Sequence, residues 1–299
     1  MPQIDAPSIE GKIALVTGAS RGIGRAIAQR LASAGARVAV TARSLEQTVA
    51  EPGTLLETVA LIERNGGQAV ALGADLEDPE DRESLVPRTV AALGGLDILV
   101  NSAGYAQYVP IAEMSDAIFD KTLDHYLRAP FVLSRAAVPA MKARGAGWIV
   151  NVGSVTSLAP TLPYGDFDRV VGPTLYAAVK AALSRFTQGF AAELETSGIA
   201  VNQVAPSSAI STPGADRYIP EGYPTEDVAY LAECALQLSY LPAAERTGLL
   251  THSMHFPAAM GFEVRSVDGR QVFPPPPAPD HSHPGIDPSG RYDGGRIPS

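Results

Sequence analysis

Short runs of β-type residues alternate with helical patterns along most of this chain, and that alternation limits its possible folds more than any other feature. The first run, KIALVT at 12–17, is apolar between its ends, and Ile23, Ile27 and Leu31 follow it at helical spacing. Further strands are expected at 37–42, 68–75, 96–101, 148–154, 199–206 and about 249–255, with helices at 54–64, 79–93, 115–125, 128–144, around Tyr176 and near 225–239. Strands separated by helices pair in parallel through right-handed crossovers, so the sequence predicts an α/β fold with a doubly wound parallel sheet.

The chain divides into one folded domain and a tail of different composition. Residues 1–271 show no internal repeat and no second domain, whereas 272–299 contain eight prolines and no apolar periodicity. Such a tail is expected to be extended polyproline or disordered, lying over a neighbouring subunit. Its HSH run at 281–283 suggests a metal, but with no acidic or cysteine cluster nearby we expect no metal site; a PxxP ligand role stays open beside a passive tail.

Composition narrows the class of partner. A formal net charge of -9 and a sequence pI near 5.1, without a basic run, argue against nucleic acid and favour a small-molecule substrate. The single cysteine, Cys234, excludes disulfides and cysteine metal sites. Residues 1–12 lack the pattern of a signal peptide, and no apolar run is long enough to span a bilayer, so we expect a cytoplasmic protein with no membrane association.

A glycine-rich turn, TGASRGIG at 17–24, lies between the first expected strand and helix. Glycines at 18, 22 and 24 allow a sharp turn and a close approach of pyrophosphate to the helix N-terminus, where free amides and the helix dipole favour anions. The alternative is a purely structural turn. Because Arg25 follows the last glycine where a P-loop has Lys-Ser/Thr, the pattern predicts dinucleotide binding.

Tyr176 and Lys180 stand four residues apart in TLYAAVKAALSRF, on one face of an expected helix. Val179, Leu183, Phe186, Phe190 and Leu194 form a separate apolar stripe that can bury the helix while the pair faces a cavity. A nearby ammonium favours the phenolate, which would bring the tyrosine toward useful acid/base strength. Taken alone the pair is weak, because such spacing also occurs by chance.

Five motifs in order make the chain resemble the short-chain dehydrogenases/reductases, Rossmann-type enzymes that bind NAD(P). TGASRGIG resembles the family's TGxxxGxG turn, NSAG at 101–104 its NNAG, and YAAVK at 176–180 its YxxxK. NVGS at 151–154 and VNQVAP at 201–206 match the segments that carry the catalytic serine and precede the nicotinamide loop. The resemblance covers about residues 10–255.

The resemblance implies a role for each matching residue. Tyr176 would be the general acid/base, Lys180 would lower its pKa and hold the nicotinamide ribose, and Ser154 would orient the reacting oxygen; the alternative for Ser154 is a turn cap. Arg21 and Arg43, in place of an acidic residue, suit the 2′-phosphate of NADP better than NAD. The cofactor-binding set implied is Gly18, Ser20, Arg21, Gly22, Ile23, Gly24, Arg43, Asp75, Leu76, Asn101, Ala103, Gly104, Tyr176, Lys180, Pro206 and Thr212.

Three departures from the family pattern stand out. Tyr126 occupies the position of an asparagine that completes a proton relay to the lysine; Tyr126 or His125 would have to replace it, or proton exchange would be slower. Residues 155–175 are an insertion expected to shape the substrate pocket, and Ser207 replaces a usual glycine.

The sequence therefore favours an oxidoreductase that transfers hydride between NADP(H) and a secondary alcohol or ketone. A dinucleotide-binding scaffold or sensor without turnover is the alternative, and a sugar-nucleotide epimerase is disfavoured because few residues follow 206. The apolar positions of 115–144 and of the Tyr176 helix exceed what one sheet face can cover, so we expect a homodimer or homotetramer. They are Ile118, Leu123, Phe131, Val132 and Leu133, with Phe186 and Phe190.

Overall fold

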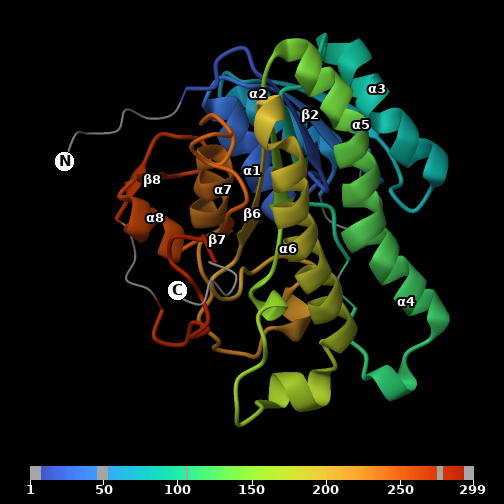
Figure 1. The fold of residues 1–299 in the computed structure, drawn as a ribbon, viewed down its shortest axis with the longest axis vertical. Helices are drawn as coiled ribbons and strands as arrows, with labels where there is room; N and C mark the ends of the chain where they lie inside the picture. Colours follow the sequence, from blue (N-terminus) through green and yellow to red (C-terminus); the bar gives the residue numbers. More distant parts are fainter. Residues whose placement is uncertain (1–7, 46–52, 106, 275–278, 293–299) are drawn as a thin grey trace.

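A computed structural model describes residues 8–45, 53–105, 107–274 and 279–292 (Figure 1). Seven parallel strands form one sheet in the order β3-β2-β1-β4-β5-β6-β7, which confirms the predicted doubly wound fold. The strands are β1 (Ile13–Thr17), β2 (Arg37–Ala42), β3 (Gln68–Gly73), β4 (Ile98–Asn101), β5 (Gly147–Val152), β6 (Ile199–Ala205) and β7 (Leu250–His252).

Helices cover both faces of the sheet. The longer ones are α1 (Gly22–Ser33), α2 (Leu55–Arg64), α3 (Pro79–Leu93), α4 (Asp116–Leu123), α5 (Ala129–Arg144), α6 (Thr174–Leu194) and α7 (Val228–Gln237), followed by the short α8 (His255–Met260). Side chains of α1, α2 and α7 belong to one buried apolar cluster, and those of α3, α5 and α6 to the other. The core therefore lies in two layers, one on each side of the sheet.

The strand order reverses between β1 and β4, because β1 pairs with both β2 and β4. Crossovers from these two strands leave on opposite faces, so a crevice opens beyond their carboxyl ends. The loops that follow β1, β4, β5 and β6 all converge there. The five family motifs lie at the carboxyl ends of β1, β4, β5 and β6, on the loops that follow these strands, or on α6.

Several connecting segments have local structure that the sequence periodicity does not reveal. A π-helical turn, η2 (Asp124–Arg128), joins α4 to α5, and the insertion contains η3 (Val155–Ser157) and a second π-helical turn, η4 (Phe167–Val171). Short 3₁₀ turns occur at η1 (Ile111–Glu113), η5 (Glu195–Ser197) and η6 (Asp216–Tyr218). The last expected strand is shorter than 249–255, because the chain turns into α8 after His252.

The C-terminal segment differs from the tail that its composition predicts. β8 (Val264–Arg265) pairs with β9 (Val272–Phe273), so this hairpin crosses the division expected after residue 271. Part of the polyproline run, 275–278, lies outside the described residues. Residues 279–292 form a series of turns that hydrogen-bond to the body of the same chain, instead of an extended strand or a disordered tail.

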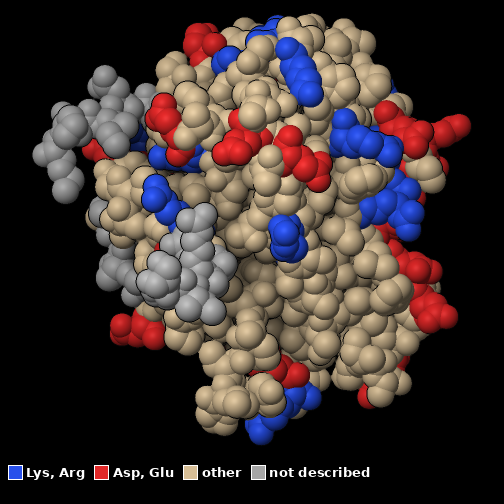
Figure 2. Space-filling model, viewed as in Figure 1, with Lys and Arg blue, Asp and Glu red and all other residues tan. Residues whose placement is uncertain are grey.

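Charged side chains of both signs are mixed on the face of the molecule shown in Figure 2. On the face shown in Figure 2, Lys and Arg side chains are scattered among Asp and Glu and form no continuous basic patch. Among the described residues, no helix has the length and apolar character needed to cross a bilayer.

Candidate active site

A cavity of about 1350 Å³ lies in the crevice beyond the carboxyl ends of β1, β4, β5 and β6. It exceeds the few hundred to about 1,000 Å³ of a typical small-molecule site, so it has room for a dinucleotide and a second ligand. Its lining includes almost every residue of the implied cofactor and catalytic sets.

The glycine-rich turn is packed too closely for side chains. A Cβ built on Gly18, whose φ is +66°, would lie 2.6 Å from Ala103 Cα, and a Cβ on Gly24 would lie 2.3 Å from the carbonyl oxygen of Gly18. The Thr17 hydroxyl accepts hydrogen bonds from the Ser102 and Ala103 amides at 3.0 and 2.9 Å, which ties this turn to the end of β4. The turn thus presents bare backbone and the N-terminus of α1 to the cavity, an arrangement that fits a pyrophosphate.

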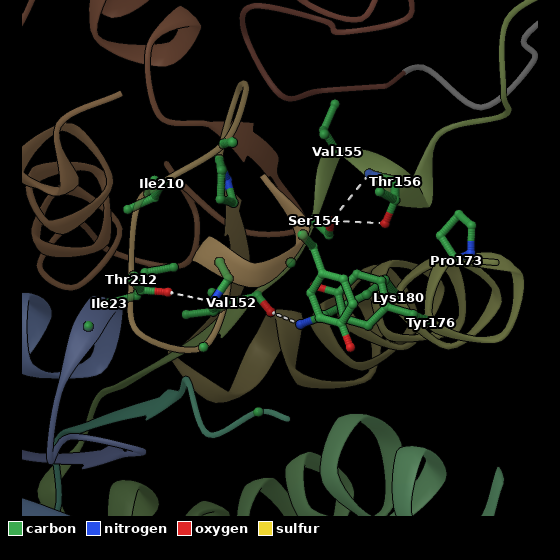
Figure 3. Close-up of a pocket in the computed structure, with 18 of the residues that line it drawn as sticks. Ile23, Val152, Ser154, Val155, Thr156, Pro173, Tyr176, Lys180, Ile210 and Thr212 are labelled. Atoms are coloured by element: carbon green, nitrogen blue, oxygen red, sulfur yellow. Dashed lines mark hydrogen bonds between the residues drawn. The ribbon is translucent and has the colours of Figure 1, made fainter. Parts of the chain in front are cut away.

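Lys180 is buried in the cavity wall, close to Tyr176 and the end of β5 (Figure 3). Its Nζ donates a hydrogen bond to the Val152 carbonyl at 2.7 Å, where β5 ends. Burial lowers the pKa of Lys180 to about 7. The ammonium is therefore held in a place where a negative charge brought by a ligand would favour its protonated form.

Tyr176 lies one turn before Lys180 and lines the cavity together with Ser154. Burial raises the pKa of Tyr176 to about 12, and the polar hydroxyl of Ser154 opposes that rise. The sequence predicts that the lysine lowers the pKa of Tyr176, whereas in the structure this pKa is raised. Desolvation of the phenolate has the larger effect, because Lys180 Nζ is 5.7 Å from the centre of the Tyr176 ring.

Ser154 has two roles in the structure. It caps η3, since its Oγ accepts from the Thr156 amide at 3.2 Å and shares a hydrogen bond with the Thr156 hydroxyl at 2.9 Å (Figure 3). It also lines the cavity beside Tyr176. Ser154 therefore caps a turn and lines the cavity at the same time, so the two roles considered from the sequence are compatible.

Tyr126 fills the position of the relay asparagine with an aromatic ring. Its ring centroid is 4.4 Å from Lys180 Nζ and 5.1 Å from that of Tyr176, in an edge-on arrangement. Its hydroxyl lies beside Gly104, where an added Cβ would be 2.9 Å from it, while Lys180 Nζ donates to the Val152 carbonyl. His125, the other substitute, is held by Glu77 through Nε2 at 3.0 Å. Neither side chain continues a hydrogen-bonded path from Lys180.

Arg43 stands at the cavity margin after β2, about half exposed, where its guanidinium pairs with Glu77 at 3.5 Å. Glu77 also binds Lys121 and His125, each at 3.0 Å. The ion pair of Arg43 is long and solvated, so a stronger anion can replace it at little cost. Arg21 lines the same end of the cavity.

Asn101 is the one expected cofactor residue that does not line the cavity. Its Nδ2 donates to Asn151 Oδ1 at 2.9 Å and to the Ser134 hydroxyl at 3.2 Å, so it joins β4 to β5 and α5 inside the core. The adjoining Ser102, Ala103 and Gly104 form that part of the wall instead. The direction of the Asn101 side chain is thus set by Ser134 and Asn151, which are far from it in the sequence.

Three aromatic residues near Tyr176 were not singled out from the sequence. Tyr108 meets Tyr176 edge-on at 5.3 Å between centroids, and its ring also contacts those of Phe167 at 5.6 Å and Tyr218 at 4.3 Å. They come from the loop after β4, the insertion and the loop after β6. No local periodicity marks such residues, because only the fold brings the three loops together.

The family comparison agrees with this geometry. The profile of the family described as short chain dehydrogenase matches residues 12–219, which is more than half of the chain. The chain therefore belongs to the short-chain dehydrogenase/reductase family and is an NAD(P)-dependent oxidoreductase that acts on CH-OH or carbonyl groups.

Individual relatives point the same way. An uncharacterized oxidoreductase of Thermotoga maritima is 40% identical over 201 residues, 67% of this chain and 73% of the relative. The 3-oxoacyl-(acyl-carrier-protein) reductase FabG of Escherichia coli is 39% identical over 199 residues, 67% of this chain and 74% of the relative. A short chain dehydrogenase from Burkholderia cenocepacia, solved in complex with NADP, is 36% identical with a TM-score of 0.67 and matches 80% of this chain and 95% of its own.

Proposed function

We propose that this protein interconverts a secondary alcohol and a ketone with NADP(H), using Tyr176 as general acid/base. The observation that carries the proposal is the convergence of Tyr176, Ser154 and Lys180 on one wall of a cavity whose other end is the bare glycine turn. Reduction of a ketone by NADPH, followed at the nicotinamide absorbance, tests it.

Each residue has a distinct part in the reduction. Ser154 donates a hydrogen bond to the carbonyl oxygen and holds it beside Tyr176, whose hydroxyl gives that oxygen its proton. A bound NADPH supplies the hydride to the carbonyl carbon. Lys180 in its protonated form stabilises the phenolate left on Tyr176 and holds the ribose; the reverse direction uses the same phenolate as base.

The position of the Tyr126 side chain affects how Tyr176 can regain its proton after each turnover. Lys180 Nζ donates to the Val152 carbonyl and meets Tyr126 through the face of its ring, so we expect that proton to arrive through solvent in the cavity. The competing function is that of an NADP-binding scaffold or sensor with little turnover. It is favoured by the presence of Tyr126 in place of the relay asparagine. A panel of ketones with NADPH separates the two, because a scaffold would bind NADPH and oxidise none of it.

Arg43→Ala is expected to weaken binding of NADPH by roughly 1.5–3 kcal/mol, the size of a lost charge-assisted contact to phosphate. NADH lacks the 2′-phosphate, so its binding should change far less. Titration of both cofactors into the wild-type and variant proteins measures the difference. Arg88→Ala is the matched control, because Arg88 is also partly exposed and paired with a carboxylate, Asp81, but does not line the cavity. Equal losses for the two cofactors would exclude Arg43 as the phosphate reader.

We also propose a homodimer or homotetramer assembled through α5 and α6. Phe131 is 45% exposed, and its ring contacts Phe186, which stacks on Phe190 at 5.4 Å between centroids. Leu133, by contrast, is fully buried inside the subunit and does not contribute to this surface. The single-domain division and a cytoplasmic location stay predictions from the sequence.

Phe190→Glu is expected to shift the mass in solution from that of an oligomer to that of a monomer, because it buries a charge in an apolar contact. Phe131→Glu should do the same with less risk to the fold, since its side chain is already half exposed. Leu56→Glu serves as control: Leu56 is 48% exposed on α2, on the other face of the sheet. Light scattering at micromolar concentration gives the masses, and a monomeric wild-type protein would contradict the proposal.

A further inference from the structure

The C-terminal segment 279–292 is attached to the body at a sheet edge. The Leu250 amide, in the last strand β7, donates to the Gly290 carbonyl at 2.8 Å. The Asp287 carboxylate accepts from the Ser289 amide at 2.8 Å and from the Tyr292 amide at 3.0 Å, so the turn that contains Gly290 is closed by its own hydrogen bonds. In Figure 1 the segment lies beside β7 and α8.

A histidine bridge connects the same segment to the loop after β6. The buried Ser207 hydroxyl accepts from the Met254 amide at 2.9 Å and bonds His255 Nδ1 at 2.9 Å, while His255 Nε2 lies 3.3 Å from the Ser282 hydroxyl. Burial lowers the pKa of His255, and a neutral imidazole has one acceptor and one donor nitrogen. The ring therefore bridges Ser207 and Ser282, with one nitrogen as donor and the other as acceptor.

Two further histidines connect the segment to both sides of the cavity. The His283 imidazole donates to the Ala159 carbonyl in the insertion at 2.9 Å. His281 Nε2 lies 3.1 Å from the Ser208 hydroxyl, and its ring meets Tyr223 edge-on at 5.5 Å between centroids. Residues 281–284 line the cavity and so complete its wall between the insertion and the loop after β6.

Several aromatic rings line the cavity on the same side as this wall. Tyr108 contacts the ring of Tyr176, and Phe167 and Tyr218 in turn contact Tyr108. A substrate whose oxygen meets Tyr176 and Ser154 has these rings and the C-terminal segment around the remainder of its body. Apolar groups gain free energy on transfer to such surroundings, and rings pack well edge-on against rings.

We propose that residues 281–284 form the outer wall of the substrate subsite in their own subunit, and that this wall selects alcohols and ketones with a bulky, ring-containing apolar body. The proposed substrate preference rests on the proposed function of the cavity. The position of residues 281–284 is independent of that function, because it follows from contacts within the protein.

The wall is tested in the full chain with the double variant His281→Ala/His283→Ala and two ketones, cyclohexanone and the bicyclic 2-decalone. The wild-type protein should prefer 2-decalone in kcat/KM, and the double variant should lower that preference about tenfold, a typical change when part of an apolar pocket is removed. Asp280→Asn, an exposed neighbour with no contact to the cavity, should leave the ratio within about twofold. An unchanged ratio in the double variant would overturn the proposed selection.

Hydrogen exchange gives a readout that does not need turnover. Amides of residues 285, 286 and 290 and of Leu250 should exchange slowly in the wild-type protein, and Ser207→Gly, which removes the anchor of His255, should speed exchange at 285 and 286. Fast exchange of these amides in the wild-type protein would overturn the wall. If the wild-type protein reduces neither ketone while these amides are protected, the choice of substrate fails and the wall stands.

Discussion

Tyr176→Phe is expected to lower kcat by about two to four orders of magnitude, the usual contribution of a positioned general acid. The variant loses only the hydroxyl, while its ring keeps the edge-on contacts to Tyr126 and Tyr108, so the fold and the cavity should be unchanged. The Kd for NADPH should stay within about twofold, because the phenol supplies a proton and little binding energy. Steady-state turnover and a separate NADPH titration measure the two quantities.

Tyr240→Phe is the matched control for this variant. The Tyr240 hydroxyl binds Gln237 at 2.9 Å, outside the cavity, so its removal should leave kcat near the wild-type value. Should Tyr176→Phe retain most of the wild-type kcat, Tyr176 would have no place in the proton transfer, and the pKa of about 12 would then describe only a buried core tyrosine.

Ser154→Ala is expected to lower kcat by about 10² to 10³, the typical loss when one donor to a developing oxyanion is removed. The same change also removes the cap of η3, which costs about 1 kcal/mol of stability. Thermal unfolding and turnover therefore need to be measured together. Both effects should appear, because the hydroxyl binds Thr156 and faces the cavity.

Ser154→Thr separates the two roles of this serine. It keeps a hydroxyl at the same position and should recover part of the turnover and part of the cap. A Ser154→Ala protein that loses stability and keeps its full kcat would leave only the structural role, and the reacting oxygen would then need another hydrogen-bond donor.

Local signals in the sequence predicted the elements well. The helix expected at 79–93 is observed as Pro79–Leu93, because Asp78 caps its first turn and Gly94, with φ +86°, ends it. The cluster of catalytic and cofactor motifs was also predictable, since the loops after parallel strands meet at one edge of a sheet. These features are predictable because capping residues mark the ends of a helix and the parallel topology places the loops together.

The features that could not be predicted from the sequence depend on contacts between residues far apart in the chain. Asn101 turns into the core because Asn151 and Ser134 offer it partners, and the ring of Tyr126 packs against Lys180 and Tyr176, which lie on another helix. The composition of 272–299 predicts no folded structure, yet partners in the body hold residues 279–292 in turns. Each of these outcomes depends on residues brought together only by folding.

The central claim is that the cavity transfers hydride from NADPH to a ketone carbon. A single-turnover reaction of the wild-type protein with NADPH deuterated on both faces of the nicotinamide C4 tests it directly. We expect one deuterium on the carbinol carbon of the product and an unlabelled proton on its oxygen. Bound NADPH that stays unoxidised with every ketone, or a product alcohol without deuterium on that carbon, would contradict it.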